Sequence, residues 1–317
     1  PFAALALFDS SSIQKKVAAN HIFEEQKIYE NKSFFNRKIF NDKIKLAYFS
    51  SDFKIHPVSH LIAGMFEQHD KSKFELYAFS LSSIKKDKMF RRIFSVFDHF
   101  IDVSSKSIQQ IVSLSRELNI DIAIDLMGFT KSNRYEIFLR RVAPIQINYL
   151  GYSGTFGSDN MDYIIADKNL IVDQNNFSEK IIYLPESFMV TDFKGLNLRK
   201  TIKRENYGIS SNAFVFCCFN KQYKITPGIF DIWIKLLRKI NDSILWLKIN
   251  NSEAKLNIQK QAEKKGIDPK KIVFAENIDL ENHLSRYNLA DLFLDTFPYG
   301  AHTTCVDSLW SGLPVLT

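Results

Sequence analysis

The sequence has 317 residues, which is long enough for two domains. Hydrophobic residues make up 45% and aromatic residues 14%, as in a well-packed globular protein rather than a disordered chain. The net charge is +7, and the basic residues are scattered among acidic ones. We therefore expect a solvated surface suited to anionic substrates, and we expect no nucleic-acid partner.

The three cysteines, Cys217, Cys218 and Cys305, include no C-x-x-C pair. They predict buried thiols in a reducing compartment, the cytoplasm, rather than disulfides or metal ligands. No apolar run reaches about 18 residues, so no membrane span is predicted, and no signal peptide is evident. The chain starts at Pro1 and ends directly after the apolar run Pro314–Leu316, so we expect a fragment of a longer protein.

The first half of the chain predicts a helical lead-in, residues 1–43, followed by a domain of alternating strands and helices, residues 44–190. Several of these strands are apolar on both faces, which is typical of a buried parallel sheet covered by helices. The predicted strands are Ile44–Phe49, Phe74–Leu81, His99–Val103, Ile120–Leu126, Ile145–Leu150, Tyr163–Ala166 and Ile181–Leu184, and the predicted helices are 57–69, 84–93, 105–118 and 132–141.

Residues 191–212 interrupt the alternation with small and charged residues and predict a crossing to a second domain, residues 213–317. In that domain we expect strands 214–219, 244–249, 272–274, 292–294 and 315–317, with helices 227–240, 252–265, 280–289 and 303–311. The predicted fold class is therefore α/β, with two Rossmann-like, doubly wound domains in series. Such domains bind ligands at the carboxyl ends of their strands, which predicts a cleft between them.

The segment Phe214–Pro227 predicts a buried strand, a polar turn and the start of an amphipathic helix. Thr226 is suited to cap that helix and Pro227 to its first position. Lys221 and Lys224 then lie in a loop that leads to a helix amino terminus, where free N–H groups and the helix dipole favour anions. We expect a phosphate site here, and the alternative is a solvated lysine on a turn.

A histidine follows the first strand of the first domain. His56 stands just before Pro57, which is expected to open a helix. At the carboxyl end of a strand, a histidine can serve as a general base near neutral pH. The alternative is a histidine that only caps the helix, and His60, one turn further on, is expected to be structural.

Two other motifs mark the first domain. Asp121 and Asp125 are four residues apart in a predicted strand and so share one face. One of them is expected to orient a site histidine or the acceptor, or else both pair with neighbouring cations. A loop with three glycines, Gly151, Gly154 and Gly157, would let a ligand approach the backbone closely.

In the second domain, Asp295–Trp310 predicts a strand end, a glycine-containing loop and a helix capped by Thr303 or Thr304. Hydroxyls and free N–H groups at that helix start could hold a phosphate, and Asp307 could accept from ribose hydroxyls. Thr304 and Asp307 also have the spacing of a capping box, and both interpretations can hold together.

His283 and Arg286 share one face of the predicted helix 280–289 and would either frame a nucleobase or lie on the surface. The sequence contains no D-x-D motif and no His/Cys metal spacing, so no metal cofactor is expected. Any diphosphate would then be neutralised by lysine and by helix ends.

Seven stretches occur in a fixed order: SSDFKIHPVSH, DLMGFTKSNR, APIQINYLGYSGTFGSDNMDYIIAD, SEKIIYLPESF, FVFCCFNKQYKITP, ILWL and LADLFLDTFPYGAHTTCVDSLWSGLPV. Together they resemble the O-linked N-acetylglucosamine transferase family, glycosyltransferase family 41, which includes the plant Spindly proteins and bacterial relatives. The resemblance covers residues 44 to 317, and the FCCFN stretch favours a bacterial-type member without the long insert of the animal enzymes.

The resemblance implies a GT-B fold, here with a truncated second domain, and an inverting, metal-independent transfer of a sugar from a nucleotide diphosphate to protein Ser/Thr hydroxyls. UDP-GlcNAc is the implied donor, and upstream tetratricopeptide repeats are implied in the longer protein. By motif position His56 matches the proposed base, Lys224 matches the lysine on the diphosphate, and Asp121 stands where the family has a second active-site histidine. The implied nucleotide-sugar contacts are Asn220, Lys221, His283, Arg286, His302, Thr303, Thr304 and Asp307, with Gly151 and Gly154 from the glycine loop.

Three further positions depart from the animal pattern. Lys221 stands in place of a glutamine near the phosphates, Leu280 in place of a lysine near the uracil, and Ser153 in place of a proline. The departures leave GDP-fucose, which Spindly-type members use, as an alternative donor. Two other interpretations are an epimerase or phosphorylase on the same fold, and an inactive module that binds a nucleotide sugar or a protein.

Overall fold

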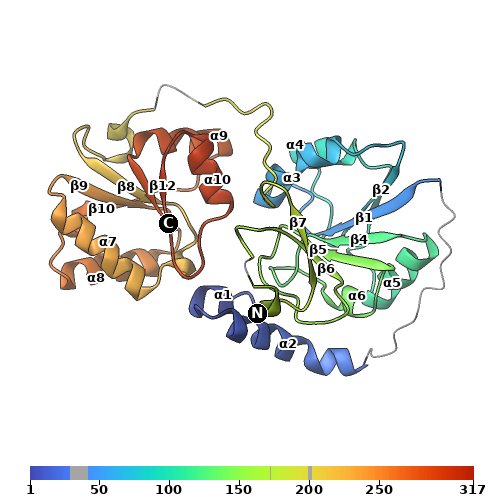
Figure 1. Ribbon diagram of the computed structural model, residues 1–317. Helices are drawn as coiled ribbons and strands as arrows, with labels where there is room; N and C mark the ends of the chain where they lie inside the picture. The colour runs from blue at the N-terminus through green and yellow to red at the C-terminus, as the bar shows by residue number, and fades with distance from the viewer. Residues whose placement is uncertain (29–41, 172, 199–201) are drawn as a thin grey trace. The chain divides into compact units, whose positions relative to one another are not determined.

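The computed structural model describes residues 1–28, 42–171, 173–198 and 202–317 (Figure 1). The chain divides into two compact units, residues 1–194 and 195–317. This division falls inside the predicted crossing, residues 191–212, and each unit contains one parallel sheet. The cleft expected between two domains stays a prediction.

Unit 1 is built on a seven-stranded parallel sheet with the order β3-β2-β1-β4-β5-β6-β7. In Figure 1 helices α3 and α4 cover one face and α5 and α6 the other, because the chain winds outward from β1 in one direction and then returns to the other side. The strands are β1 (Ile44–Ser50), β2 (Phe74–Ser80), β3 (His99–Asp102), β4 (Ile122–Asp125), β5 (Ile145–Asn148), β6 (Tyr163–Asp167) and β7 (Lys180–Leu184), and the helices are α3 (Pro57–Glu67), α4 (Lys88–Phe94), α5 (Ile108–Glu117) and α6 (Glu136–Leu139).

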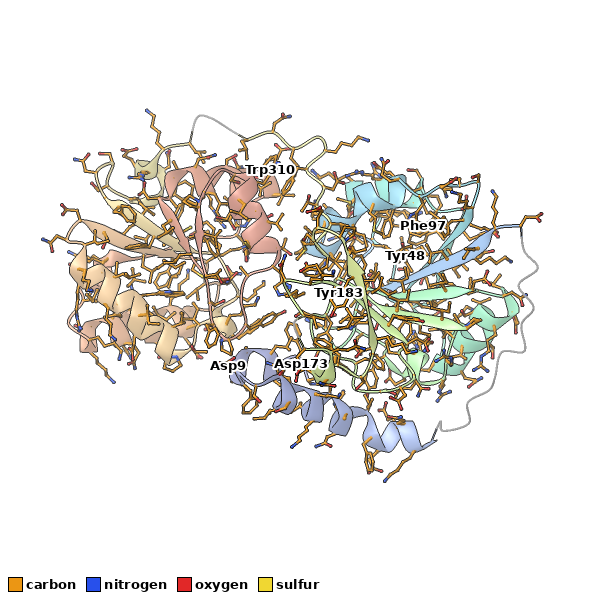
Figure 2. All side chains as sticks on the ribbon, viewed as in Figure 1. Asp9, Tyr48, Phe97, Asp173, Tyr183 and Trp310 are labelled. Atoms are coloured by element: carbon orange, nitrogen blue, oxygen red, sulfur yellow. The ribbon has the colours of Figure 1, made fainter. Side chains whose placement is uncertain are left out.

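The core of unit 1 is rich in aromatic rings that pack edge to face. The ring of Tyr48 on β1 lies 4.8 Å from that of Phe66 and 6.0 Å from that of Phe97. Tyr48 and Phe97 are labelled in Figure 2. The Tyr48 hydroxyl is hydrogen-bonded to His69 Nε2 at 2.7 Å, which satisfies the one polar atom of a buried phenol. Residues 46–50 of β1 are buried on both faces, as the sequence predicted for a covered parallel strand.

The lead-in forms α1 (Ala4–Leu7) and α2 (Ser11–Ile28), and the rest of its predicted range up to residue 41 lies outside the described residues. Helix α2 is part of unit 1 and is held to the segment before β7: Lys15 Nζ donates to the carbonyl oxygens of Asn175 and Phe177 at 2.8 and 3.1 Å. The approach requires a glycine, because a Cβ on Gly157 would come within 2.7 Å of the Ala19 nitrogen. The third glycine of the loop thus serves helix packing.

Unit 2 has a five-stranded parallel sheet with the order β10-β9-β8-β11-β12. Helices α7 and α8 lie on one face and α9 and α10 on the other (Figure 1). The strand order reverses between β8 and β11, and loops at such a switch point are where α/β sheets bind ligands. The elements are η2 (Arg204–Tyr207), β8 (Phe214–Cys218), η3 (Gln222–Lys224), α7 (Pro227–Lys239), β9 (Ser243–Leu247), α8 (Ser252–Lys264), η4 (Pro269–Lys271), β10 (Ile272–Phe274), α9 (Leu280–Ser285), η5 (Arg286–Leu289), β11 (Leu292–Leu294), α10 (Thr303–Trp310) and β12 (Val315–Leu316).

The start of α7 confirms the predicted signals. The Thr226 hydroxyl accepts from the Ile229 nitrogen at 3.4 Å, and Pro227 occupies the first turn. The predicted apolar stripe is the buried face of the helix: Phe230, Trp233, Ile234 and Leu237.

Two predicted helices are wrong in extent. Only Glu136–Leu139 of the range 132–141 is helical, because Ser132 and Arg141 adopt positive φ angles of 64° and 56°, which end a right-handed helix. The range 280–289 divides into α9 and the 3₁₀ turn η5. Within the described part of the chain, no helix combines the length and the hydrophobicity that a membrane span requires.

We predict that Gly151→Ala destabilises unit 1 by about 2–3 kcal/mol or more, because the added Cβ would lie 1.8 Å from the Leu126 carbonyl oxygen. Gly228→Ala is the matched control, since nothing lies within 4 Å of that Cβ. Urea unfolding followed by circular dichroism measures both variants. Equal midpoints for the two would show that the backbone at Gly151 relaxes freely.

Candidate functional site

The loops after β8 and β11 hold most of the residues that the sequence singled out. Asn220, Lys221 and Lys224 follow β8, and His302 to Asp307 follow β11. Because β8 and β11 are neighbours with parallel pairing, their carboxyl ends meet at one edge of the sheet. The sheet therefore brings these two groups of residues together.

Lys224 is buried, with 8% of its surface exposed, so the alternative of a solvated turn lysine is wrong. Its Nζ donates to the carbonyl oxygen of Gly300 at 2.7 Å and lies 3.6 Å from the centre of the Tyr299 ring. Burial lowers the pKa of Lys224 to about 8, and the nearby Asp295 carboxylate opposes that shift. The loop after β11 thus holds a lysine whose charge is only partly compensated.

Asp295 organises that loop. One carboxylate oxygen accepts from the Asn220 side chain at 3.0 Å and from the backbone nitrogens of Thr296 and Ala301, both at 2.7 Å. The other Asn220 amide hydrogen goes to Thr296 Oγ1 at 2.8 Å, and its carbonyl oxygen accepts from the Thr304 hydroxyl. Asn220 therefore ties the two loops together instead of presenting its amide hydrogens to a ligand.

Helix α10 begins without a side-chain cap, so the predicted caps at Thr303 or Thr304 and the capping box with Asp307 are wrong. His302 is the N-cap residue, and the Thr304 hydroxyl is directed to Asn220. Among the described residues, the backbone N–H groups of Thr303 and Thr304 have no hydrogen-bond acceptor. Two donors at a helix amino terminus are the arrangement that binds a phosphate. Burial and Lys224 lower the pKa of His302 to about 4, so this imidazole is neutral near pH 7.

His283 and Arg286 are both buried, so the alternative of surface residues is wrong. Arg286 lies 4.6 Å from the centre of the Phe219 ring, and its guanidinium donates to His283 Nδ1 at 2.5 Å and to the Glu276 carbonyl oxygen at 2.7 Å. Burial and Arg286 lower the pKa of His283 to about 2. His283 is therefore a neutral imidazole with its proton on Nε2. From that nitrogen it could donate a hydrogen bond to a carbonyl group.

Three residues of unit 2 were missed by the sequence reasoning: Asp295, Tyr299 and Lys248. Asp295 and Tyr299 are in the motif after β11, and their roles depend on how that loop folds back. Lys248 directly follows β9, a buried strand, and the rule that found Lys224 could have found it. Burial raises the pKa of Asp307 to about 7 while Lys248 opposes the shift, so Lys248 acts electrostatically on the predicted ribose contact.

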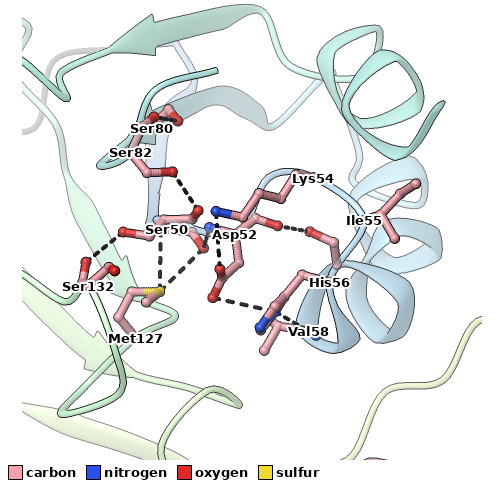
Figure 3. Close-up of polar contacts among 12 residues, drawn as sticks. Ser50, Asp52, Lys54, Ile55, His56, Val58, Ser80, Ser82, Met127 and Ser132 are labelled. Atoms are coloured by element: carbon pink, nitrogen blue, oxygen red, sulfur yellow. Dashed lines mark hydrogen bonds and ion pairs between the residues drawn. The ribbon is translucent and has the colours of Figure 1, made fainter. Parts of the chain in front are cut away.

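In unit 1, His56 is the N-cap of α3, and its Nδ1 accepts from the Val58 nitrogen at 3.4 Å (Figure 3). The same nitrogen lies 3.4 Å from Oδ2 of Asp52. A neutral Nδ1 without a proton can accept from Val58, whereas a protonated Nδ1 can donate to Asp52. The capping role and the predicted catalytic role are therefore compatible, and Asp52 is the group that would stabilise a charged His56.

The loop that carries Asp52 and His56 is fixed by serine hydroxyls and by Met127, as Figure 3 shows. Ser51 Oγ donates to the Ser132 carbonyl oxygen at 2.7 Å, and the Ser82 hydroxyl donates to the Ser51 carbonyl oxygen at 2.7 Å. The Ser51 nitrogen donates to the Met127 sulfur at 3.3 Å. These contacts hold the strand end, so the position of His56 is set by the sheet.

Asp121 does not lie with His56, and its predicted catalytic role is corrected. It stands at the amino end of β4, opposite the edge where parallel strands carry their sites, and its carboxylate accepts from the Lys45 nitrogen at 2.8 Å. Asp125, at the carboxyl end, accepts from the nitrogens of Met127 and Gly128 at 2.8 and 3.1 Å. Both aspartates therefore hold backbone N–H groups of neighbouring segments in place.

The predicted ligand approach at Gly151 and Gly154 has a structural alternative. A Cβ at Gly154 would lie 2.5 Å from the Tyr152 hydroxyl oxygen, and one at Gly151 would strike the Leu126 carbonyl oxygen. Packing inside unit 1 is thus sufficient to require both glycines. Across the described residues, no group of three or more His, Cys, Asp or Glu side chains is placed to hold a metal ion.

A doubly wound unit with a basic loop beside an uncapped helix start is the arrangement of nucleotide-binding α/β domains. The chain matches the family model of glycosyl transferase family 41 over residues 7–203 and 196–317, and it belongs to that family. The family prediction made from the motifs is confirmed.

Several known proteins are similar to the chain. It is 35% identical over 282 residues to a probable UDP-N-acetylglucosamine–peptide N-acetylglucosaminyltransferase, SEC, of Arabidopsis thaliana, covering 87% of this chain and 29% of that protein. It is 29% identical over 297 residues to the one named SPINDLY of Oryza sativa subsp. japonica, covering 90% and 31%. The chain thus spans about a third of the length of these relatives.

A solved structure, an O-GlcNAc transferase mutant of Thermobaculum terrenum, matches with a TM-score of 0.86 at 24% identity and covers 100% of this chain and 61% of that chain. This likeness shows the fold. The predicted GT-B type of α/β fold, with two parallel sheets, is confirmed.

We predict that Lys224→Met does not destabilise the protein near pH 7. The pKa of about 8 in the folded chain, against 10.5 ordinarily, means that the unfolded chain binds more protons between these values. The free energy of unfolding that this group contributes therefore rises from pH 8 to pH 10.5. Below pH 8 the ammonium group is charged in both states, and its burial lowers the free energy of unfolding by the full amount, roughly 3 kcal/mol. Methionine removes that penalty but loses a hydrogen bond and a cation–π contact of about 1 kcal/mol each.

Thermal melting at pH 7 should give the variant a midpoint equal to that of the wild type or a few degrees above it. Above pH 8, the wild type should gain relative to the variant. A lower midpoint for the variant at pH 7 would contradict this account and make Lys224 a stabilising residue.

Proposed function

We propose that the chain is the catalytic part of a protein O-GlcNAc transferase, which transfers GlcNAc from UDP-GlcNAc to Ser or Thr hydroxyls of protein acceptors. The names of the relatives support this donor and a peptide acceptor. The observation that carries the proposal is Lys224, a buried lysine that forms no ion pair with a carboxylate of the described residues and is held by the loop that leads to the uncapped start of α10. Such a lysine lowers stability, so it is best explained by an anionic ligand.

In the proposed reaction, the acceptor oxygen attacks C1 of the sugar while the bond from C1 to the diphosphate oxygen breaks, which inverts C1. The departing UDP gains negative charge. Lys224 and the N–H groups of Thr303 and Thr304 would stabilise that charge, and one donor of this kind contributes about 3–4 kcal/mol in a site that excludes water. The neutral imidazole of His302 adds a hydrogen-bond donor without adding charge.

The acceptor proton needs a base, and His56 is proposed for that role. Asp52 supports the proposal because it would stabilise the imidazolium that forms. We further propose that no metal takes part, since lysine and helix N–H groups supply the positive potential that a divalent cation would give. A cytoplasmic location is proposed because Cys217, Cys218 and Cys305 are all free thiols.

We predict that Lys224→Met lowers sugar transfer at least 10²-fold, as loss of an oxyanion donor does. The measurement is transfer of radiolabelled GlcNAc from UDP-GlcNAc to a Ser-containing peptide, with GDP-fucose as the competing donor. In the wild type, UDP affinity should fall as pH rises through about 8, because Lys224 loses its proton.

Lys224→Arg is the matched control, since its guanidinium stays charged. Its pH dependence should be flatter but not absent, because burial and neighbouring cations also lower the pKa of Lys248 to about 8. Turnover retained by Lys224→Met would refute the proposed role, and transfer from GDP-fucose alone would correct the donor.

We predict that His56→Ala lowers transfer by about 10²–10⁴-fold, the usual range for a general base. UDP affinity should stay within about twofold. His60→Ala is the control: His60 is half-buried in the same helix and should affect stability but not transfer. If both variants keep wild-type turnover, His56 is only the cap of α3.

A further inference from the structure

Unit 2 contains a pocket of about 320 Å³ at the carboxyl ends of β8 and β9. Two lysines, Lys221 and Lys248, line it, together with Phe219 and the amide side chains of Gln222 and Asn250. The register of the sheet explains the pairing: Cys218 on β8 is opposite Leu247 on β9, so Phe219 and Lys248 leave the two strands side by side. The backbone nitrogen of Lys248 donates to the Cys218 carbonyl oxygen at 3.3 Å, which holds the start of the loop against β8.

The pocket carries uncompensated positive charge. No carboxylate is among its lining residues, and neither lysine ammonium group forms a hydrogen bond or ion pair with any residue that the structure describes. Lys221 is exposed, but Lys248 is partly buried, and both Lys221 and Arg286 oppose its charge. The other groups that act on Lys248 or feel its charge are Asp307, a carboxyl whose own pKa is raised, and the neutral His283.

This arrangement costs free energy in the unliganded protein, since cations gathered at a partly buried place repel one another and lose solvation. A lysine that served only solubility would extend into water, as Lys260 does on the exposed side of α8. A bound anion would remove the repulsion. Lys248 also follows a strand next to the switch point, where α/β sheets bind ligands.

We propose that Lys248, with Lys221, binds phosphate oxygens of the donor, so that Lys248 makes the site select nucleoside diphosphates over monophosphates and free nucleosides. The inference rests on the proposed function, because it assumes that a nucleotide sugar binds to unit 2. It assigns a donor contact to a position that the motif comparison left unassigned. Lys224 and the start of α10 would then hold one part of the diphosphate and the pair Lys221 and Lys248 another.

Calorimetric titration of the full chain with UDP, UMP and uridine near pH 7 tests the proposal. For Lys248→Met we expect UDP affinity to fall about 10- to 30-fold, since a charge-assisted hydrogen bond contributes about that factor. UMP affinity should fall less and uridine affinity not at all. Lys248→Arg should bind UDP within about threefold of the wild type, and the exposed Lys260→Met should match the wild type for all three ligands.

Each result has a distinct meaning. If Lys248→Met binds UDP like the wild type, the inference is overturned and the proposed function stands. If the variant loses equal affinity for uridine and UDP, Lys248 contacts the nucleoside and the phosphate assignment is overturned. If the wild type binds none of the three ligands, the proposed function fails together with the inference. Melting curves of both Lys248 variants show whether a loss of UDP affinity comes from unfolding. If Lys248→Met is unfolded, the UDP affinity of Lys248→Arg relative to the wild type decides whether the inference holds.

Discussion

The burial of the Lys224 ammonium group is the constraint on which the rest of the candidate site depends. A lysine is seldom buried without a carboxylate partner, because the lost hydration costs several kcal/mol. Here a carbonyl oxygen and an aromatic ring take the place of water. Both belong to the loop after β11, and that loop has its shape because the carboxylate of Asp295 accepts two backbone N–H groups and the amide of Asn220. The position of the buried charge therefore depends on the shape of this loop, and so does the start of α10.

The sheet supplies the precision that the loops lack. In a parallel sheet, residues that follow neighbouring strands are placed by the strand register. In unit 2 this rule brings Phe219, Lys248 and the Asp295 loop to one edge, although they are distant in sequence. In unit 1 the same rule places His56 at the end of β1 and leaves Asp121 at the opposite edge. The difference between these two residues follows from strand direction and not from their chemistry.

Much of the fold could be predicted because the signals were local. The cap and proline of α7 and the apolar strands lie within a few residues of one another, and each prediction held. The helix predicted at 132–141 failed because the positive φ angles of Ser132 and Arg141 carry no sequence mark, unlike those of glycine. At the site, the strand-end rule pointed to Lys224, whose role as a phosphate contact stays a prediction, whereas the predicted cap at Thr304 is wrong. Its hydroxyl bonds Asn220, 84 residues away, and only the three-dimensional fold shows such a competitor.

The charge balance of unit 2 connects these observations. Burial keeps His283 and His302 neutral and raises the pKa of Asp307 to about 7, so the Asp307 carboxyl, the one of these three groups that could compensate positive charge, is only partly ionised near pH 7. Arg286 is bound to a carbonyl oxygen and to His283, so its charge is not neutralised by a carboxylate. The folded unit thus has an excess of positive potential at one edge of its sheet. A diphosphate would bring two or more negative charges to that edge, and its binding would relieve the repulsion between the lysines. By the same reasoning, Lys221 as a second cation beside Lys248 would increase the preference for a doubly charged ligand and would make the binding of such a ligand more sensitive to salt.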